Sequence, residues 1–160
     1  MCHLPKLFSK LLVPALLAAG VNVGIGTDGA ASNNRLDVLG EMRLAALLAK
    51  VTSGDPMTMP AWQALEMATI RPACALGINS DTGSLVAGKC ADLAAVRLDA
   101  LEVAPCYDPV SHLLYAAGRE HVSDVWVNGE LALREGHLTH IDARELQARA
   151  AFWRDRIKTA

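Results

Sequence analysis

The first third of the chain carries one short β-type run between helical patterns. Residues 9–19 are mostly apolar after Ser9 and are followed by Gly20, which predicts a short helix ended by a glycine. Residues 21–26 (VNVGIG) form a β-branched run bounded by glycines, which predicts a strand buried on both faces. Residues 27–34 are polar and rich in glycine and asparagine, so we expect a loop directly after this strand.

Two helices are expected after the loop. Apolar residues at spacings of three and four over residues 36–50 predict an amphipathic helix, which a Gly-Asp-Pro triplet ends. A second helix is expected over residues 60–76, because Pro60 suits a first helical turn, with a kink at Pro72. The order helix, strand, loop, helix, helix is typical of an α/β layered fold rather than of a helix bundle.

The pattern changes after residue 80 to short apolar runs separated by turn residues. Strands are expected at the runs 84–86, 92–96, 122–127 and 131–134. Asn128-Gly129 lies between the last two runs and is the strongest short signal for a β-hairpin. A terminal amphipathic helix is expected over residues 142–158, with Asp142 as its N-cap and an apolar face at Leu146, Ala150, Trp153 and Ile157.

Composition narrows the classes of protein that fit this pattern. Hydrophobic residues make up 52% of the 160 residues and charged residues 20%, which excludes an intrinsically disordered chain. The net charge of -2 and the pI of about 6.2 give no basic surface for nucleic acid, so we expect no nucleic-acid partner. The four cysteines are widely scattered, which favours reduced thiols and a cytoplasmic protein over a disulfide framework.

The N-terminal apolar run leaves a second interpretation open. Lys6 and Lys10 precede an apolar stretch that ends in small residues near Gly20, as in a secretion signal, and this alternative would leave a secreted small β-domain. The run continues without a break into the expected strand, which favours the folded interpretation. It is also too short, and too broken by Pro14 and Gly20, to cross a membrane, so we expect no membrane partner.

Residues 24–34 (GIGTDGAASNN) carry the candidate chemistry. In parallel α/β folds, ligands collect at the carboxyl ends of strands, and Asp28 stands there, between Gly26 and Gly29. A strand-end aspartate before glycine is also common as a turn residue or a helix N-cap, so spacing alone leaves both roles open. A phosphate-binding loop is disfavoured because the Walker lysine and the Rossmann glycine spacing are absent.

Several motifs in this order resemble one known family. Residues 26–34 (GTDGAASNN) and 36–50, then 64–69 (ALEMAT), 83–93 (GSLVAGKCADL) and 125–129 (VWVNG), resemble the metal-dependent amidohydrolase superfamily. Within it they are most similar to the 5-methylthioadenosine/S-adenosylhomocysteine deaminases. The similarity runs from about Leu17 to the C-terminus.

This resemblance implies an α/β fold, namely the C-terminal fragment of a TIM-like (β/α)8 barrel, part of a small β-sandwich and a C-terminal helix. Residues 1–80 would supply the last barrel strand and helices, 81–141 part of the sandwich, and 142–160 the helix. The implied activity is hydrolytic deamination of an adenosine-type nucleoside by water activated on a divalent metal, with zinc expected. Asp28 would be both metal ligand and proton shuttle, and Ser32 and Asn33 would lie on the substrate side of the loop.

One carboxylate is not a metal site, because a catalytic zinc takes three or more ligands, mostly histidine. The family's His-x-His segment is absent, and the histidines present (His3, His112, His121, His137 and His140) match no ligand position. We expect His112 and His121 to pack in the small domain and His137 and His140 to lie at the surface. The chain alone is therefore expected to be inactive and to need a missing N-terminal part or oligomerisation.

Two alternatives stay open at this point. The first is a non-catalytic truncated remnant or interaction module. The second is another member of the superfamily, such as a triazine chlorohydrolase or a guanine deaminase.

Overall fold

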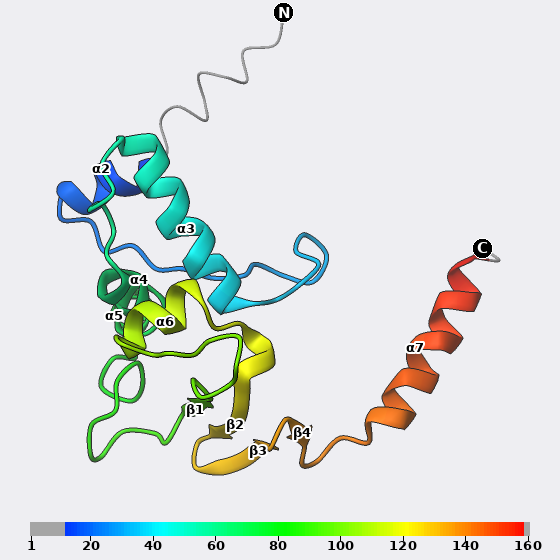
Figure 1. Cartoon of the computed structure of the whole chain (residues 1–160). Coiled ribbons are helices and arrows are strands. Elements are labelled where there is room, and N and C mark those ends of the chain that lie inside the picture. The colour runs from blue at the N-terminus through cyan, green and yellow to red at the C-terminus, as the bar shows by residue number, and fades with distance from the viewer. Residues whose placement is uncertain (1–11, 159–160) are drawn as a thin grey trace, which may run out of the picture.

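The computed structural model describes residues 12–158, and its first half is a lobe of short helices (Figure 1). These helices are α2 (Leu12–Ala18), α3 (Val38–Ser53), α4 (Ala61–Ala68) and α5 (Ile70–Leu76). The predicted helix at 36–50 is confirmed as α3. Its N-cap is Asp37, whose carboxylate accepts a hydrogen bond from Gly40 N at 3.1 Å, and Gly54 ends it with a left-handed φ of 71°. The predicted helix at 9–19 is confirmed over Leu12–Ala18, and its first residues lie outside the described range.

The core lies between α3, α4 and a helix from the second half of the chain, α6 (Pro109–Tyr115). Its largest fully buried side chains are Met42, Met59, Met67 and Leu114. Arg43 fixes α6 to α3, because its guanidinium donates hydrogen bonds to the carbonyl oxygens of Leu114, at 2.9 Å, and of Ala117. Helix α6 was not predicted, although Asp108-Pro109 begins it in the N-cap and first-turn positions that these residues favour.

The helix expected over residues 60–76 is two helices, and the expected kink at Pro72 was wrong. The break comes at Thr69, which has φ −130° and ψ −90°. Pro72 lies instead in the first turn of α5, where its missing N–H is not required. Gly77 ends α5 in the left-handed region, which agrees with the predicted end of the helix at residue 76.

Residues 21–26 do not form the predicted strand. They are extended and partly or fully exposed, and no ladder partner pairs with them among residues 12–158. A β-branched run becomes a buried strand only when neighbouring strands supply hydrogen bonds and cover both faces. Here the segment has helices beside it instead of strands: Ile25 N donates to Met67 O at 2.7 Å, and Val23 and Ile25 pack on the core.

The second half contains an antiparallel sheet in the order β1-β2-β3-β4. Its strands are β1 (Leu93–Val96), β2 (Val122–Val127), β3 (Glu130–Arg134) and the short β4 (His137–Leu138). The hairpin predicted at Asn128-Gly129 is confirmed, with φ of 50° and 81° at the two turn residues. The strand expected at 84–86 was wrong: these residues are loop, where Leu85 and Val86 are exposed.

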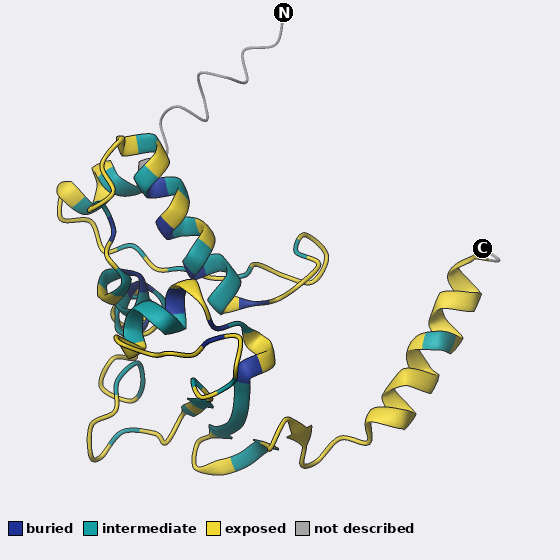
Figure 2. Ribbon diagram, in the orientation of Figure 1, coloured by how far each residue is buried: buried dark blue, intermediate teal, exposed yellow. Residues whose placement is uncertain are grey.

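The predicted terminal helix is confirmed as α7 (Ala143–Lys158), with Asp142 accepting hydrogen bonds from Arg144 N and Glu145 N. It extends away from the rest of the chain, and none of its residues is buried (Figures 1 and 2). A helical lobe, one small sheet and a free-standing helix thus make up the described residues. They close no barrel and form no second sheet of a sandwich. No helix in this range is long and apolar enough to cross a membrane.

Candidate functional site

The loop that follows the extended segment presents Asp28 at the surface. Asp28 has a positive φ of 60°, a conformation that aspartate tolerates better than most residues because its short polar side chain can bond locally. Its Oδ1 accepts a hydrogen bond from Gly29 N at 2.7 Å, and its Oδ2 accepts one from Ser32 Oγ at 2.7 Å. Both carboxylate oxygens are therefore held in a fixed orientation.

These two hydrogen bonds also set the charge of Asp28. The Ser32 hydroxyl, and after it the Gly29 N–H, stabilise the ionised form and hold the pKa of the carboxyl below its ordinary value of 3.8. The carboxyl is thus anionic at neutral pH while it remains exposed to solvent. An exposed, oriented carboxylate can bind a divalent cation or accept a proton, which are the two roles expected of it.

Asn33 uses its side chain to hold the loop together. Its Nδ2 donates to Thr27 O at 2.9 Å and to Glu41 Oε1 at 2.7 Å, while its Oδ1 accepts from Arg35 N at 3.0 Å. Both ends of the loop and helix α3 are joined through this one amide. Glu41 was not predicted as part of the site, because it lies on α3, eight residues after Asn33, and the contact depends on the turn geometry.

The extended segment before Asp28 is fixed against α4 and α5. Asn22 Nδ2 donates to Arg71 O at 2.8 Å. A Cβ on Gly24 would lie 2.9 Å from Pro72 Cβ, so only glycine allows this close approach. The helices at 61–76 thereby determine the direction in which the chain enters the Asp28 loop.

The described residues place no further metal ligands beside Asp28. Within residues 12–158, no three His, Cys, Asp or Glu side chains converge to hold a metal. His121 is buried, accepts a hydrogen bond at Nδ1 from Gly118 N and lies 3.3 Å from Glu102 Oε1 through Nε2. His112 lies on α6, which packs on the helical lobe and not in the small sheet domain as expected, and it is hydrogen-bonded within α6 and its preceding loop. His137 and His140 are exposed, as predicted.

The donor set of residues 12–158 therefore fits a divalent metal only in part. Asp28 supplies one hard oxygen donor of the kind found among zinc ligands, whereas a catalytic zinc takes three or more. His3, the remaining histidine, lies outside the described residues. Cys74, Cys90 and Cys106 are exposed free thiols far apart in the sequence, and Cys2 lies outside the described range.

The described residues thus combine a loop-borne carboxylate after an extended segment, three helices that follow it, and a small antiparallel sheet. The sequence profile of the Amidohydrolase family matches residues 10–132, which is most of the chain. This chain belongs to the amidohydrolase family.

Two of the curated relatives carry the same enzyme name. The chain is 44% identical over 160 residues to a 5-methylthioadenosine/S-adenosylhomocysteine deaminase from Teredinibacter turnerae, covering 97% of this chain and 36% of the relative. It is 47% identical over 151 residues to the enzyme of the same name from Moorella thermoacetica, covering 91% of this chain and 35% of that protein. The chain thus spans about a third of the length of these curated relatives.

Two solved, zinc-containing structures superpose on most of this chain. A crystal structure of an adenosine deaminase from Xanthomonas campestris with bound zinc superposes with a TM-score of 0.89 at 45% identity, over 95% of this chain and 36% of that chain. The zinc complex of atrazine chlorohydrolase from Arthrobacter aurescens gives 0.78 at 34% identity, over 87% and 31% of the two chains.

Proposed function

We propose that this chain is the C-terminal part of a hydrolase that deaminates an adenosine-type nucleoside, with 5-methylthioadenosine and S-adenosylhomocysteine as the substrate class. The Asp28 carboxylate carries the proposal, because it is exposed, oriented and anionic at the end of the segment that leads into the loop. The identities of 44% and 47% to enzymes named for this activity support it. The lower identity of 34% to the atrazine enzyme makes a chlorohydrolase the weaker candidate.

Asp28 is proposed as one ligand of a divalent metal, with zinc favoured by the zinc-containing structural relatives. A divalent metal held there would lower the pKa of bound water to about 7 and would supply a nucleophile at neutral pH. The Asp28 carboxylate would take a proton from that water and deliver it to the departing amine nitrogen. A C–O bond forms, a C–N bond breaks, and ammonia leaves.

Ser32 and Asn33 are proposed to serve the substrate side of the loop in different ways. The Ser32 hydroxyl fixes the Oδ2 oxygen of Asp28 and holds the carboxyl in its charged form. Asn33 is a positioning residue, because its amide is already bonded to Thr27 O, Glu41 and Arg35 N. Its proposed contribution is the shape of the surface next to the substrate.

The further proposal is that the chain is inactive by itself. One carboxylate does not hold a catalytic zinc. The remaining ligands would come from a polypeptide equivalent to the part of the longer relatives that this chain does not span. A non-catalytic interaction module is the alternative function. It predicts that no addition of such a polypeptide restores turnover.

The test joins this chain to the portion of the Xanthomonas campestris deaminase that it does not match. Metal content and loss of 5-methylthioadenosine are measured together, by elemental analysis and ultraviolet absorbance. We expect deamination in the joined protein and none in the chain alone. Asp28→Asn should lower kcat/KM at least about 100-fold, whereas Asp99→Asn, which alters an exposed carboxylate outside the loop, should leave it unchanged. Equal activity of the two variants would refute the role of Asp28.

A further inference from the structure

The turn between β2 and β3 contains the two groups of a covalent modification. The side-chain amide of an asparagine is open to attack by the backbone nitrogen of the next residue, and asparagine is for this reason a thermolabile residue. A glycine in the next position favours the attack, because it has no side chain that would hinder ring closure. Asn128 and Gly129 are both exposed, so water and solvent base reach them.

The reaction needs no component other than water. The Gly129 nitrogen gives its proton to solvent and attacks Cγ of Asn128. A C–N bond forms, the bond between Cγ and Nδ2 breaks, and Nδ2 takes a proton from solvent and leaves as ammonia. Water then opens the cyclic imide at one of its two carbonyl carbons, which gives aspartate or isoaspartate. Either product carries one negative charge that asparagine lacks at neutral pH.

The folded turn keeps the two reacting atoms apart. The φ values of 50° at Asn128 and 81° at Gly129 are those of a type I′ turn, whose first central residue has a ψ of about 30°. Ring closure requires Cβ of Asn128 and the Gly129 nitrogen to lie on the same side of the Cα–C bond, which this ψ does not allow. The turn must therefore open locally before the ring can form.

Residues 91 and 92, which directly precede β1, hold the turn closed. Ala91 O accepts a hydrogen bond from Gly129 N at 3.1 Å, so the attacking nitrogen is engaged as a donor. Asp92 Oδ1 accepts one from Asn128 N at 2.7 Å. Asp92 is itself fixed, because its Oδ2 accepts a hydrogen bond from Thr82 Oγ1 at 3.0 Å. A segment 36 residues away in the sequence thus controls how often the turn opens.

We propose that Asn128 is a site of spontaneous deamidation, and that the hydrogen bonds to Ala91 O and Asp92 Oδ1 set its rate. The turn is protected while these two acceptors hold it, and it reacts in the fraction of molecules in which they release it. Because deamidation is irreversible, the modified fraction records how long the turn has been open.

Isoaspartate at position 128 would open the hairpin. Its main chain runs through the former side-chain carboxyl and is one methylene longer, which a two-residue turn between the paired residues Val127 and Glu130 does not accommodate. β3 would then lose its register with β2. β4, whose ladder partner among the described strands is β3, would be released with it.

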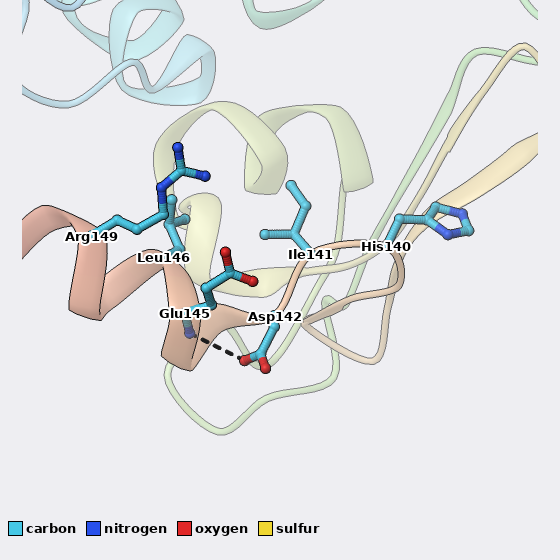
Figure 3. Close-up of a pocket in the computed structure, with 6 residues that line it drawn as sticks. All are labelled: His140, Ile141, Asp142, Glu145, Leu146 and Arg149. Carbon is cyan, nitrogen blue, oxygen red and sulfur yellow. Dashed lines mark hydrogen bonds between the residues drawn. The ribbon is translucent and has the colours of Figure 1, made fainter.

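The hollow at the base of α7 lies beyond this sheet and provides an internal reference (Figure 3). The residues that line it all come from one continuous segment, 140–149, so they do not depend on the hairpin. In the modified chain, amide hydrogen exchange should therefore become faster in β2, β3 and β4 and stay unchanged over residues 140–149.

The test follows deamidation of the full chain at neutral pH by mass spectrometry of its proteolytic peptides, which detects the replacement of NH₂ by OH. The chain is incubated folded and in urea at the same pH. We expect Asn128 to react at least about tenfold more slowly in the folded chain than in urea. Asp92→Ala removes one of the two acceptors and should speed the reaction of the folded chain at least about threefold.

Two further variants make this result specific. Asp92→Asn keeps an oxygen acceptor for Asn128 N, and the Thr82 hydroxyl can accept from the new amide, so the rate should stay that of the unaltered chain. An acceleration equal to that of Asp92→Ala would exclude the acceptor as the cause. Asp124→Ala is the matched control, because Asp124 accepts a hydrogen bond from Glu135 N at 3.3 Å at the other turn of the same sheet. It should leave the rate at Asn128 unchanged.

Three results would overturn the proposal: equal rates in the folded chain and in urea, an unchanged rate in Asp92→Ala, or equal acceleration by Asp92→Ala and Asp124→Ala. The last result would show that the overall stability of the sheet sets the rate. If circular dichroism shows that Asp92→Ala is unfolded, Thr82→Val takes its place, because it frees Asp92 Oδ2 and leaves both acceptors present. An unchanged rate in Thr82→Val would then overturn the proposal.

Discussion

The structure makes a sharp prediction about Asn33, whose amide joins the Asp28 loop to helix α3. In the Asn33→Asp variant, the donor Nδ2 becomes an acceptor that faces Thr27 O at 2.9 Å and Glu41 Oε1 at 2.7 Å. Two hydrogen bonds are lost and two carboxylates are brought together. The fold of the loop should therefore be destabilised, although the substitution changes hardly any volume.

The expected loss in the free energy of unfolding has three contributions, namely the two lost hydrogen bonds and the repulsion between the two carboxylates. A hydrogen bond to a charged acceptor contributes about 1.5–3 kcal/mol and one between neutral groups about 1 kcal/mol. Two unit charges about 4 Å apart repel by about 1 kcal/mol in water, and by more near a protein surface. The site is partly exposed and the loop can relax, so we expect a loss of about 3 kcal/mol in the free energy of unfolding.

The assay is urea denaturation followed by circular dichroism, with matched variants. Asn34→Asp makes the same change in charge at the next residue, whose side chain is exposed, and should cost less than about 0.5 kcal/mol. Adding Glu41→Gln to Asn33→Asp restores a donor facing the new carboxylate and should recover about half of the loss. If Asn33→Asp and Asn34→Asp unfold at the same urea concentration, the amide does not hold the loop.

Two further predictions concern side chains that donate hydrogen bonds. Ser32→Ala removes the larger cause of the lowered pKa of Asp28, so carboxyl titration by NMR should show that pKa rising toward 3.8. In the unaltered chain, the stabilisation linked to the Asp28 carboxyl is present above pH 3.8 and is lost as the pH falls through the pKa of the folded state. Arg43→Met removes both bonds between α3 and the carbonyls at the end of α6 and should lower the free energy of unfolding by about 2 kcal/mol, whereas Arg149→Met on the exposed α7 should change it by less than about 0.5 kcal/mol in the same denaturation assay.

The elements that the sequence predicted well have local causes. The hairpin follows from Asn128-Gly129, because both residues tolerate the positive φ that a two-residue turn requires. Helix α7 follows from its Asp142 cap and its apolar spacing. Asp28 was likewise placed correctly in a loop, since glycines on both sides leave the backbone free to turn there.

The features that the sequence did not predict depend on packing or on backbone geometry that residue patterns do not specify. Helix α6 has clear local signals at Asp108-Pro109, but the short apolar runs of this half of the chain favoured strands. The packing of α6 on α3 stabilises the helix. The break at Thr69 comes one turn earlier than Pro72 suggested, because a proline is accommodated in a first helical turn. The fixed orientation of the Asp28 carboxyl required knowing that the turn brings Ser32 to 2.7 Å, which spacing alone does not give.

The unpaired segment at residues 21–26 and the metal site proposed at Asp28 would be completed by the same neighbours. Residues 21–26 run directly into Asp28, and within the described range no strand pairs with either of their edges. In a parallel α/β barrel, the strands that would pair with this segment bring their own carboxyl ends next to Asp28, where side chains from several strands converge. Neighbours that satisfy the backbone of residues 21–26 would therefore also deliver side chains to the one carboxylate present. The same addition should order the extended segment and complete the ligand set, so a variant or partner that restores only one of the two would contradict this account.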